Sequence, residues 1–193
     1  MARLTRSFYS RSALIVAREL LGCILVRRVG ETVLRGRIVE TEAYLSDDPA
    51  SHSFRGITPR NAVMFGPAGH LYVYFTYGMH YCANVVTGKE GIGEAVLLRA
   101  VEPLEGTEVM MRNRYGPKSG RNETVLLKNL TNGPAKLAKA FALTTAHSGV
   151  DLLADEMYIL RGKPVPARSV ITTPRIGISK ATEKLWRYIV VSG

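Results

Sequence analysis

The chain has 193 residues, of which 46% are hydrophobic and 22% are charged, a balance that argues against a largely disordered protein. This length suits one folded domain with a hydrophobic core of its own. The formal net charge of +10 favours a polyanionic partner, although many basic proteins carry such a charge only to stay soluble.

Cysteine use and the apolar segments indicate the compartment. Cys23 and Cys82 lie far apart without a Cys-x-x-Cys motif, so we expect neither a disulfide framework nor a zinc site. The basic N-terminus could suit an export or transit signal, but the apolar run over residues 13–17 is too short and is followed by Arg18 and Glu19. No apolar segment approaches the length of a membrane span. We therefore predict a cytoplasmic protein without membrane contact, with a mitochondrial transit peptide as the less favoured alternative.

The periodicity of apolar residues predicts both helices and strands along the chain. In the N-terminal half we expect a helix over residues 12–21, strands over 24–29 and 32–44, a long loop over 46–61, and a hairpin with strands over 71–76 and 81–86. In the C-terminal half we expect a strand over 94–101, a helix over 104–114, a basic loop over 115–123, a helix over 133–140, a short strand or turn within 151–160, and strands over 169–178 and 186–191. The sequence thus predicts an α+β fold, with a single mixed domain over residues 1–193, a largely antiparallel curved β-sheet, flanking helices and a protruding β-hairpin.

The predicted hairpin is rich in tyrosine and contains four of the nine tyrosines of the chain. Its first strand alternates between an apolar face and a face that carries Tyr72 and Tyr74. Gly78 allows a tight turn, which leaves Tyr77 at the tip. Two interpretations stay open. Either Tyr77 packs back onto the sheet, or it is a wedge that enters a flat, stacked partner.

The charges around this hairpin favour one of the two interpretations. No carboxylate occurs between Asp48 and Glu90, whereas Arg55, Arg60 and Lys89 fall within this span. Contact with a phosphate backbone requires a surface that is free of acidic residues. The charge pattern therefore favours the wedge.

Two glutamates mark the strand predicted over residues 32–44. Glu40, Glu42 and Tyr44 share one face of this strand, and the residues between them are mostly suited to burial. Either the strand is a solvated edge, or a partly buried glutamate there acts as a general base on water. His52, in the long loop, could equally be a surface residue. No metal-binding, P-loop or dinucleotide motif occurs, so we expect no metal and no cofactor.

Together these features suit an enzyme that extrudes one nucleotide from a duplex and acts on it. Stacking on tyrosine contributes roughly 1–3 kcal/mol per base, and a wedge fills the gap left in the duplex. A non-catalytic nucleic-acid-binding module with the same stacking face is one alternative. Carbohydrate hydrolysis by Glu40 and Glu42 is a weaker one, because neighbours on one strand face are poorly placed to act across a cleft.

Several separated motifs follow the pattern of one known family in order. They are residues 39–44 (VETEAY), 52–53 (HS), 58–61 (TPRN), 71–74 (LYVY), 77–79 (YGM), Asn84, 97–100 (LLRA) and 133–137 (GPAKL). On these motifs, from Phe8 to the C-terminus, the chain resembles the alkyladenine (3-methyladenine) DNA glycosylase family, and its bacterial members most closely. The resemblance implies a monofunctional enzyme, without metal or cofactor, that acts in base excision repair. Such an enzyme flips alkylated or deaminated purines out of duplex DNA and hydrolyses the N-glycosidic bond, leaving an abasic site.

The resemblance also implies roles for individual residues. Glu42 is expected to be the general base that activates the attacking water, which Arg99 and the backbone near Ile176 would hold. The flipped base is expected to contact Tyr44, His52, Tyr74 and Asn84, of which Asn84 would disfavour normal guanine. Tyr77 is expected to intercalate into the duplex. Water positioning or DNA contacts are further expected from Arg60, Met79 and Lys136, although plain solvation is the favoured alternative for Lys136.

The same resemblance extends to substrates and partners. The expected partner is double-stranded DNA with damaged purines, bound by a monomer in the cytoplasm at the nucleoid. Alkylation at N3 or N7 leaves a cationic base with a weak glycosidic bond, which makes 3-methyladenine and 7-methylguanine the first expected substrates. Ethenoadenine and hypoxanthine are less secure, because these neutral bases need protonation as well.

Overall fold

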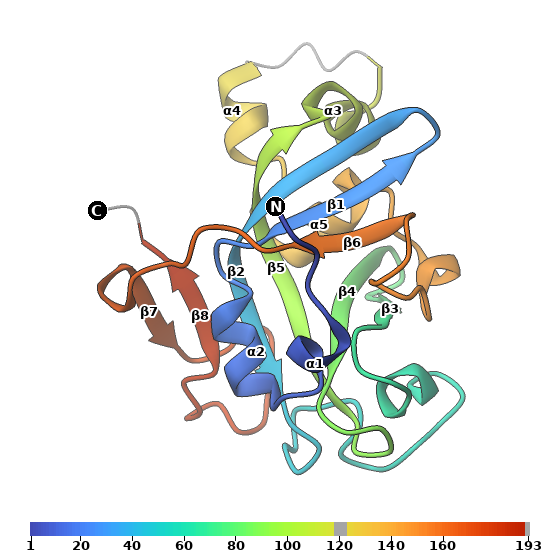
Figure 1. The fold of residues 1–193 in the computed structure, drawn as a ribbon, viewed down its shortest axis with the longest axis vertical. Coiled ribbons are helices and arrows are strands. Elements are labelled where there is room, and N and C mark those ends of the chain that lie inside the picture. The colour runs from blue at the N-terminus through green and yellow to red at the C-terminus, as the bar shows by residue number, and fades with distance from the viewer. Residues whose placement is uncertain (118–122, 192–193) are drawn as a thin grey trace.

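A curled antiparallel sheet runs through the molecule, and short helices pack against it (Figure 1). The computed structural model describes residues 1–117 and 123–191. The strands in these residues are β1 (Ile24–Val29), β2 (Thr32–Tyr44), β3 (Leu71–Thr76), β4 (His80–Thr87), β5 (Glu94–Glu105), β6 (Met157–Leu160), β7 (Val170–Thr173) and β8 (Arg187–Val190). Their order is β3-β4-β5-β2-β1-β6, while β8 pairs with both β2 and β7. The predicted α+β class with a largely antiparallel sheet is confirmed.

The helices are short and are held by packing rather than by their own length. They are α1 (Arg6–Tyr9), α2 (Ala13–Glu19), α3 (Thr107–Tyr115), α4 (Glu123–Lys128) and α5 (Pro134–Ala140), with 3₁₀ turns η1 (Ala62–Phe65), η2 (Thr145–His147) and η3 (Ala167–Ser169). Helix α2 packs against β2 and β5, whereas α5 packs against β4, β5 and α3. Most of the basic loop predicted over residues 115–123 lies outside the described residues.

The helix predicted over residues 104–114 begins later than expected. Strand β5 continues to Glu105, and helix α3 begins only at Thr107. Gly106 makes the turn between them with a φ of +74°. A Cβ atom added at Gly106 would lie 2.6 Å from the carbonyl oxygen of Val33, so only glycine fits this close approach.

One predicted strand near the C-terminus is shorter than expected, and a second is the short strand that was one of the two alternatives within residues 151–160. The strand predicted over residues 169–178 ends at Thr173, because Pro174 has no N–H to donate to the ladder. Within residues 151–160 only β6 is a strand, which begins at Met157. The remainder of these segments forms loops, and one of the loops reaches the site described below.

Strands β2 to β5 have two buried faces with different roles. Successive side chains of a strand point to opposite faces. The core face carries Leu71, Val73, Ala83, Val85, Val96 and Leu98. The residues that alternate with them line a pocket on the opposite face: Tyr72, Tyr74, Cys82, Asn84, Ala95, Leu97 and Arg99. The sheet therefore separates the core from the pocket.

Replacement of Phe141 by alanine should lower the free energy of unfolding by about 3–5 kcal/mol, because a buried aromatic ring would leave a cavity. Phe141 follows α5, has no exposed surface and packs toward Gly36 on β2. Urea unfolding followed by circular dichroism measures the change. Ile15, which is 47% exposed on α2, is the control, and Ile15→Ala should cost about 0.5 kcal/mol or less. Equal costs for the two variants would contradict the packing described for Phe141.

Candidate active site

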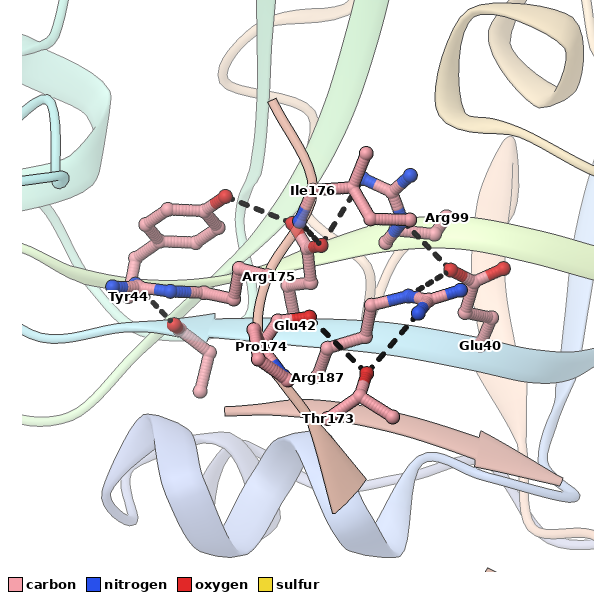
Figure 2. A network of polar contacts seen from close by, with 10 residues as sticks. Glu40, Glu42, Tyr44, Arg99, Thr173, Pro174, Arg175, Ile176 and Arg187 are labelled. Carbon is pink, nitrogen blue, oxygen red and sulfur yellow. Dashed lines mark hydrogen bonds and ion pairs between the residues drawn. The ribbon is translucent and has the colours of Figure 1, made fainter. Parts of the chain in front are cut away.

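Glu42 is a buried carboxylate surrounded by hydrogen-bond donors (Figure 2). Its Oε2 accepts a hydrogen bond from the Tyr44 hydroxyl at 2.8 Å, and its Oε1 accepts one from the Ile176 backbone N–H at 2.9 Å. The Nη1 atom of Arg99 lies 3.2 Å from the same Oε1. A carboxylate out of water is costly unless it is paired and hydrogen-bonded. These donors therefore stabilise the ionised form of Glu42, which is the form that a general base requires.

Arg99 on β5 links Glu42 to a second carboxylate. Its Nε donates to Glu40 Oε1 at 2.8 Å, and its side chain is only 10% exposed. Burial disfavours the charged guanidinium, but Glu42 and Glu40 outweigh this effect and hold the pKa of Arg99 above its ordinary value. Glu40 is thus bound to arginine and does not face Glu42 across a cleft. This arrangement speaks against carbohydrate hydrolysis by the two glutamates.

A pocket of about 330 Å³ borders this network, and we call it the tyrosine pocket. Its volume falls at the lower end of the range of small-molecule sites. The side chains that line it include Tyr44, His52, Met64, Tyr72, Tyr74, Asn84, Arg99 and Ile176. Glu42 has no exposed surface but contacts three of these lining residues. The structure therefore brings Tyr44, His52, Tyr74, Asn84, Arg99 and Ile176 together beside Glu42.

Apart from Arg99, the residues that line the tyrosine pocket are aromatic, aliphatic or neutral polar ones. The rings of His52 and Tyr74 have centroids 4.5 Å apart, and the Tyr72 hydroxyl lies 3.0 Å from His52 Nδ1. Burial raises the pKa of Tyr44 and of Tyr74, so both phenols stay neutral. Desolvation and the charge of Arg60 lower the pKa of His52, which favours a neutral imidazole at neutral pH. Such a wall suits a planar, electron-poor ring.

The long loop before β3 is held in place by Asn61. Its Nδ2 donates to the carbonyl oxygens of His52 and Gly56, at 2.8 Å and 3.0 Å. Arg60 Nη2 donates to the carbonyl oxygen of Phe75 at 2.9 Å. These bonds tie the loop to the hairpin and fix the position of His52. The expected contact of Arg60 with water or DNA stays a prediction.

A buried ion pair between Asp48 and Arg175 holds the segment that reaches Glu42. Both side chains are fully buried, and Arg175 Nη2 donates to Asp48 Oδ1 at 3.1 Å. Arg175 Nη1 also donates to the Ala43 carbonyl oxygen at 3.0 Å, and the guanidinium lies 4.6 Å from the Tyr44 ring centroid. Because Ile176 directly follows Arg175, this pair fixes the position of the Ile176 backbone N–H, which donates a hydrogen bond to Glu42.

Tyr77 stands at the tip of the β3–β4 hairpin and points to solvent. Its side chain is 80% exposed, and that of Met79 is 70% exposed. Tyr77 has a φ of +51° and Gly78 a φ of +68°, so two successive left-handed residues make the turn. The interpretation that Tyr77 packs back onto the sheet is therefore wrong.

Comparison with known proteins identifies the family. A profile of the methylpurine-DNA glycosylase family matches residues 7–192. The chain belongs to this family. It is 49% identical over 186 residues to a protein of Carboxydothermus hydrogenoformans, an alignment that covers 96% of this chain and 93% of that protein. It is 48% identical over 192 residues to one of Chlorobaculum tepidum, covering 98% and 88% of the two chains. Both relatives bear the name "Putative 3-methyladenine DNA glycosylase".

Membership in the methylpurine-DNA glycosylase family confirms the resemblance predicted from the motifs. It also confirms the prediction of a hydrolase that acts on N-glycosyl bonds, with DNA as the substrate. The roles of the individual residues stay predictions, since the family match tests none of them.

The sequence did not reveal several residues that hold the network around Glu42 in place. Asp48 and Arg175 were not singled out, and neither was Arg187, which binds Glu40. Asp48 is the last acidic residue before the acid-free span, but nothing in the spacing couples it to Arg175. Tyr72 was placed on the correct strand face without a role, yet it anchors His52.

Lys136 and Met79 lie outside the tyrosine pocket. Lys136 Nζ donates to Asn132 Oδ1 at 2.8 Å. Together with Lys139, Lys136 and Met79 line a separate hollow of about 740 Å³ beside the hairpin. The structure therefore does not bring these two residues to Glu42, and their expected contacts with DNA stay predictions.

Over residues 1–117 and 123–191, no group of three or more His, Cys, Asp or Glu side chains is placed to hold a metal ion. In the same described part of the chain, no helix combines the length and hydropathy that a membrane span needs. Cys23 and Cys82 are free and buried.

Replacement of Asp48 by asparagine should lower the free energy of unfolding by about 3–5 kcal/mol, because the guanidinium of Arg175 would stay buried without a counter-charge. Urea unfolding measures this loss. The matched control is Asp155→Asn, because Asp155 forms an ion pair with Arg3 in which its own side chain is 84% exposed. This control should leave the unfolding midpoint almost unchanged. If both variants had the same small effect, Asp48 and Arg175 would not hold the site together.

Proposed function

We propose that this chain is a monofunctional DNA glycosylase of base excision repair, built as one domain over residues 1–193. It extrudes a damaged purine from duplex DNA into the tyrosine pocket, hydrolyses the N-glycosidic bond and leaves an abasic site. The observation that supports this most directly is the position of Glu42. A buried carboxylate that accepts hydrogen bonds from Tyr44 and Ile176 borders a pocket lined largely by aromatic side chains.

The proposed reaction needs one water molecule, held where Arg99 and Ile176 border the pocket. The water oxygen forms a bond to the deoxyribose C1′ atom while the bond between C1′ and the base nitrogen breaks. The electron pair of the broken bond leaves with the base, and Glu42 takes a proton from the water. Positive charge develops on the sugar ring in such a transition state, and a fixed carboxylate nearby stabilises it.

The proposed substrates follow from this set of groups. The network around Glu42 contains the proposed base and its charged partner Arg99, and the aromatic side chains of the pocket are neutral. Alkylation at N3 or N7 gives a cationic base that leaves without help from a strong acid, which favours 3-methyladenine and 7-methylguanine. The neutral ring of His52 avoids repulsion of such a cation. Ethenoadenine and hypoxanthine are proposed as slower substrates, because their departure needs a proton.

The neighbouring residues support binding of a single purine. Tyr44 and Tyr74 are proposed to stack on the extruded base, and Asn84 to contact its edge and disfavour guanine. Asn84 is only 5% exposed, and its Nδ2 donates to the Tyr72 carbonyl oxygen at 3.2 Å, so its orientation is fixed. Tyr77 is proposed to enter the duplex and fill the gap.

Several further contacts belong to the same proposal. Arg60, Met79 and Lys136 are proposed to touch DNA beside the tyrosine pocket, since all three lie near the hairpin. We also propose that the enzyme acts as a monomer in the cytoplasm. A non-catalytic DNA-binding module would have no use for an ionised carboxylate next to the pocket, which is why we favour hydrolysis.

The variant Glu42→Gln should lose about 10²–10⁴-fold in the rate of base release, because the general base is removed while the shape is kept. Single-turnover release of 3-methyladenine from a duplex measures the rate, and a gel-shift assay should detect unchanged DNA binding. Glu105→Gln is the matched control, since Glu105 forms an exposed ion pair with Arg35 away from the pocket. Full activity of Glu42→Gln would refute the assigned base. A wild-type chain that binds DNA but releases no base from a panel of lesions would support the binding module instead.

The variant Tyr77→Ala should weaken capture of the lesion about tenfold or more, because loss of one base-stacking ring costs roughly 1–3 kcal/mol. Its thermal stability should match that of the wild type, since the side chain is 80% exposed. Fluorescence of a 2-aminopurine placed beside the lesion reports extrusion of the base. Tyr77→Phe keeps the ring and is the control that should retain capture. A large loss of stability in Tyr77→Ala would show that Tyr77 serves packing.

A further inference from the structure

We propose that Arg187 and Glu40 are positioning residues that hold Arg99 against Glu42. Together they also set the net charge that surrounds the Glu42 carboxylate. This inference rests on the proposed function, in which Glu42 acts in its ionised form. Arg187 lies on β8, the last strand of the described chain, and belongs to none of the motifs that led to the site.

The contacts form a continuous chain, visible in Figure 2. Glu40 Oε1 accepts hydrogen bonds from Arg99 Nε at 2.8 Å and from Arg187 Nε at 2.6 Å. Arg187 Nη1 in turn donates to Thr173 Oγ1 at 3.1 Å. A guanidinium that is held at Nε by one carboxylate keeps a fixed plane, so Arg99 Nη1 is aimed at Glu42.

The backbone brings these groups together at a junction of three strands. Glu40 pairs with Ala100 of β5 on one side and with Ile189 of β8 on the other. The register between β2 and β5 shifts on both sides of Glu40, which marks a β-bulge. Bulges near active sites re-aim side chains. Arg187 is the cross-strand partner of Glu42, so the two side chains share one face of the sheet.

Burial makes these contacts strong. The side chains of Arg99, Glu40 and Arg187 are 10%, 14% and 18% exposed. Charges that are largely out of water interact more strongly than exposed pairs, which contribute little. By contrast, the pair Arg35–Glu105 joins β2 and β5, as Glu40–Arg99 does, but both of its side chains are more than 40% exposed. It offers a matched control.

The network contains two carboxylates and two guanidinium groups, so its formal charge is zero. Without Arg187, Arg99 would be the one guanidinium that faces both carboxylates. The network would then carry a net negative charge, and protonation of Glu42 would become easier. Without the charge of Glu40, both guanidinium groups would act on Glu42 alone, and its protonation would become harder. The two losses therefore have opposite signs. A merely structural role would give two variants that are impaired in the same way.

Other groups also face Glu42 and must stay unchanged in the test. The titratable and charged side chains around it, from every element packed against it, are Tyr44, Tyr74, Cys82, Arg99 and, through Tyr44, the pair Asp48–Arg175. The tyrosines and Cys82 are neutral at the pH values concerned, because burial raises the pKa of each. His52 lines the same pocket and gains a proton as the pH falls, but it is unchanged in every variant, so differences between the profiles report the two arginine–glutamate contacts.

The test measures single-turnover release of 3-methyladenine as a function of pH for Arg187→Gln, Glu40→Gln and the double variant. The acid limb of the rate profile should move to higher pH in Arg187→Gln and to lower pH in Glu40→Gln, each by up to about one pH unit. The double variant should return toward the wild-type profile. Arg35→Gln and Glu105→Gln should leave the profile in place.

Arg187→Lys covers the case in which Arg187→Gln does not fold. It keeps the charge but lacks the Nε donor, so the acid limb should stay in place while the plateau rate falls. Shifts in the same direction for Arg187→Gln and Glu40→Gln, or unchanged profiles for both, would overturn the inference. The proposed function fails separately: in that case the wild type releases no base, or Glu42→Gln keeps full activity.

Discussion

The structure depends on one constraint, which is the burial of a carboxylate with no exposed surface. Donors from three separate parts of the chain reach Glu42 and offset the cost of its burial. One donor comes from its own strand, one from β5, and one from the backbone of a loop far along the chain. Each of these donors needs support of its own, and the Asp48–Arg175 pair and Glu40 provide it. The polar network is therefore fully connected from the pocket to the edge of the sheet.

The alternation of side chains in the sheet allows this network to exist beside a normal core. One face of β2 to β5 is aliphatic and gives the fold its stability. The opposite face carries aromatic and charged groups that would destabilise a core but together form a pocket. Because the same backbone positions both sets, the pocket inherits the rigidity of the core without sharing its chemistry. A rigid scaffold of this kind suits a reaction that depends on placement of one water molecule and one base.

Local pattern was enough to predict most of the strands, whereas the set of pocket residues was expected from the family resemblance. The alternation in residues 71–76 and the placement of Glu40, Glu42 and Tyr44 on one face both follow from the period of a strand. The errors concern the boundaries of elements, as at Gly106, where a close backbone contact ends β5. The supporting residues could not be predicted. The partners of Arg175 and Arg187 lie more than a hundred residues away in the sequence, and spacing carries no information on such pairings.

The residues that complete the network around Glu42 are synthesised late, which affects how the network assembles. Arg175, Ile176 and Arg187 leave the ribosome after all of β1 to β6. Until they arrive, a nascent chain has Glu42 and much of its pocket, but lacks the loop and the strand that complete the charge balance. Assembly of the network around Glu42 thus depends on segments that follow β6 in the chain. A chain that lacks these residues would keep Glu42, Tyr44 and Arg99 but lose the Ile176 N–H and the Arg187 guanidinium that complete the network.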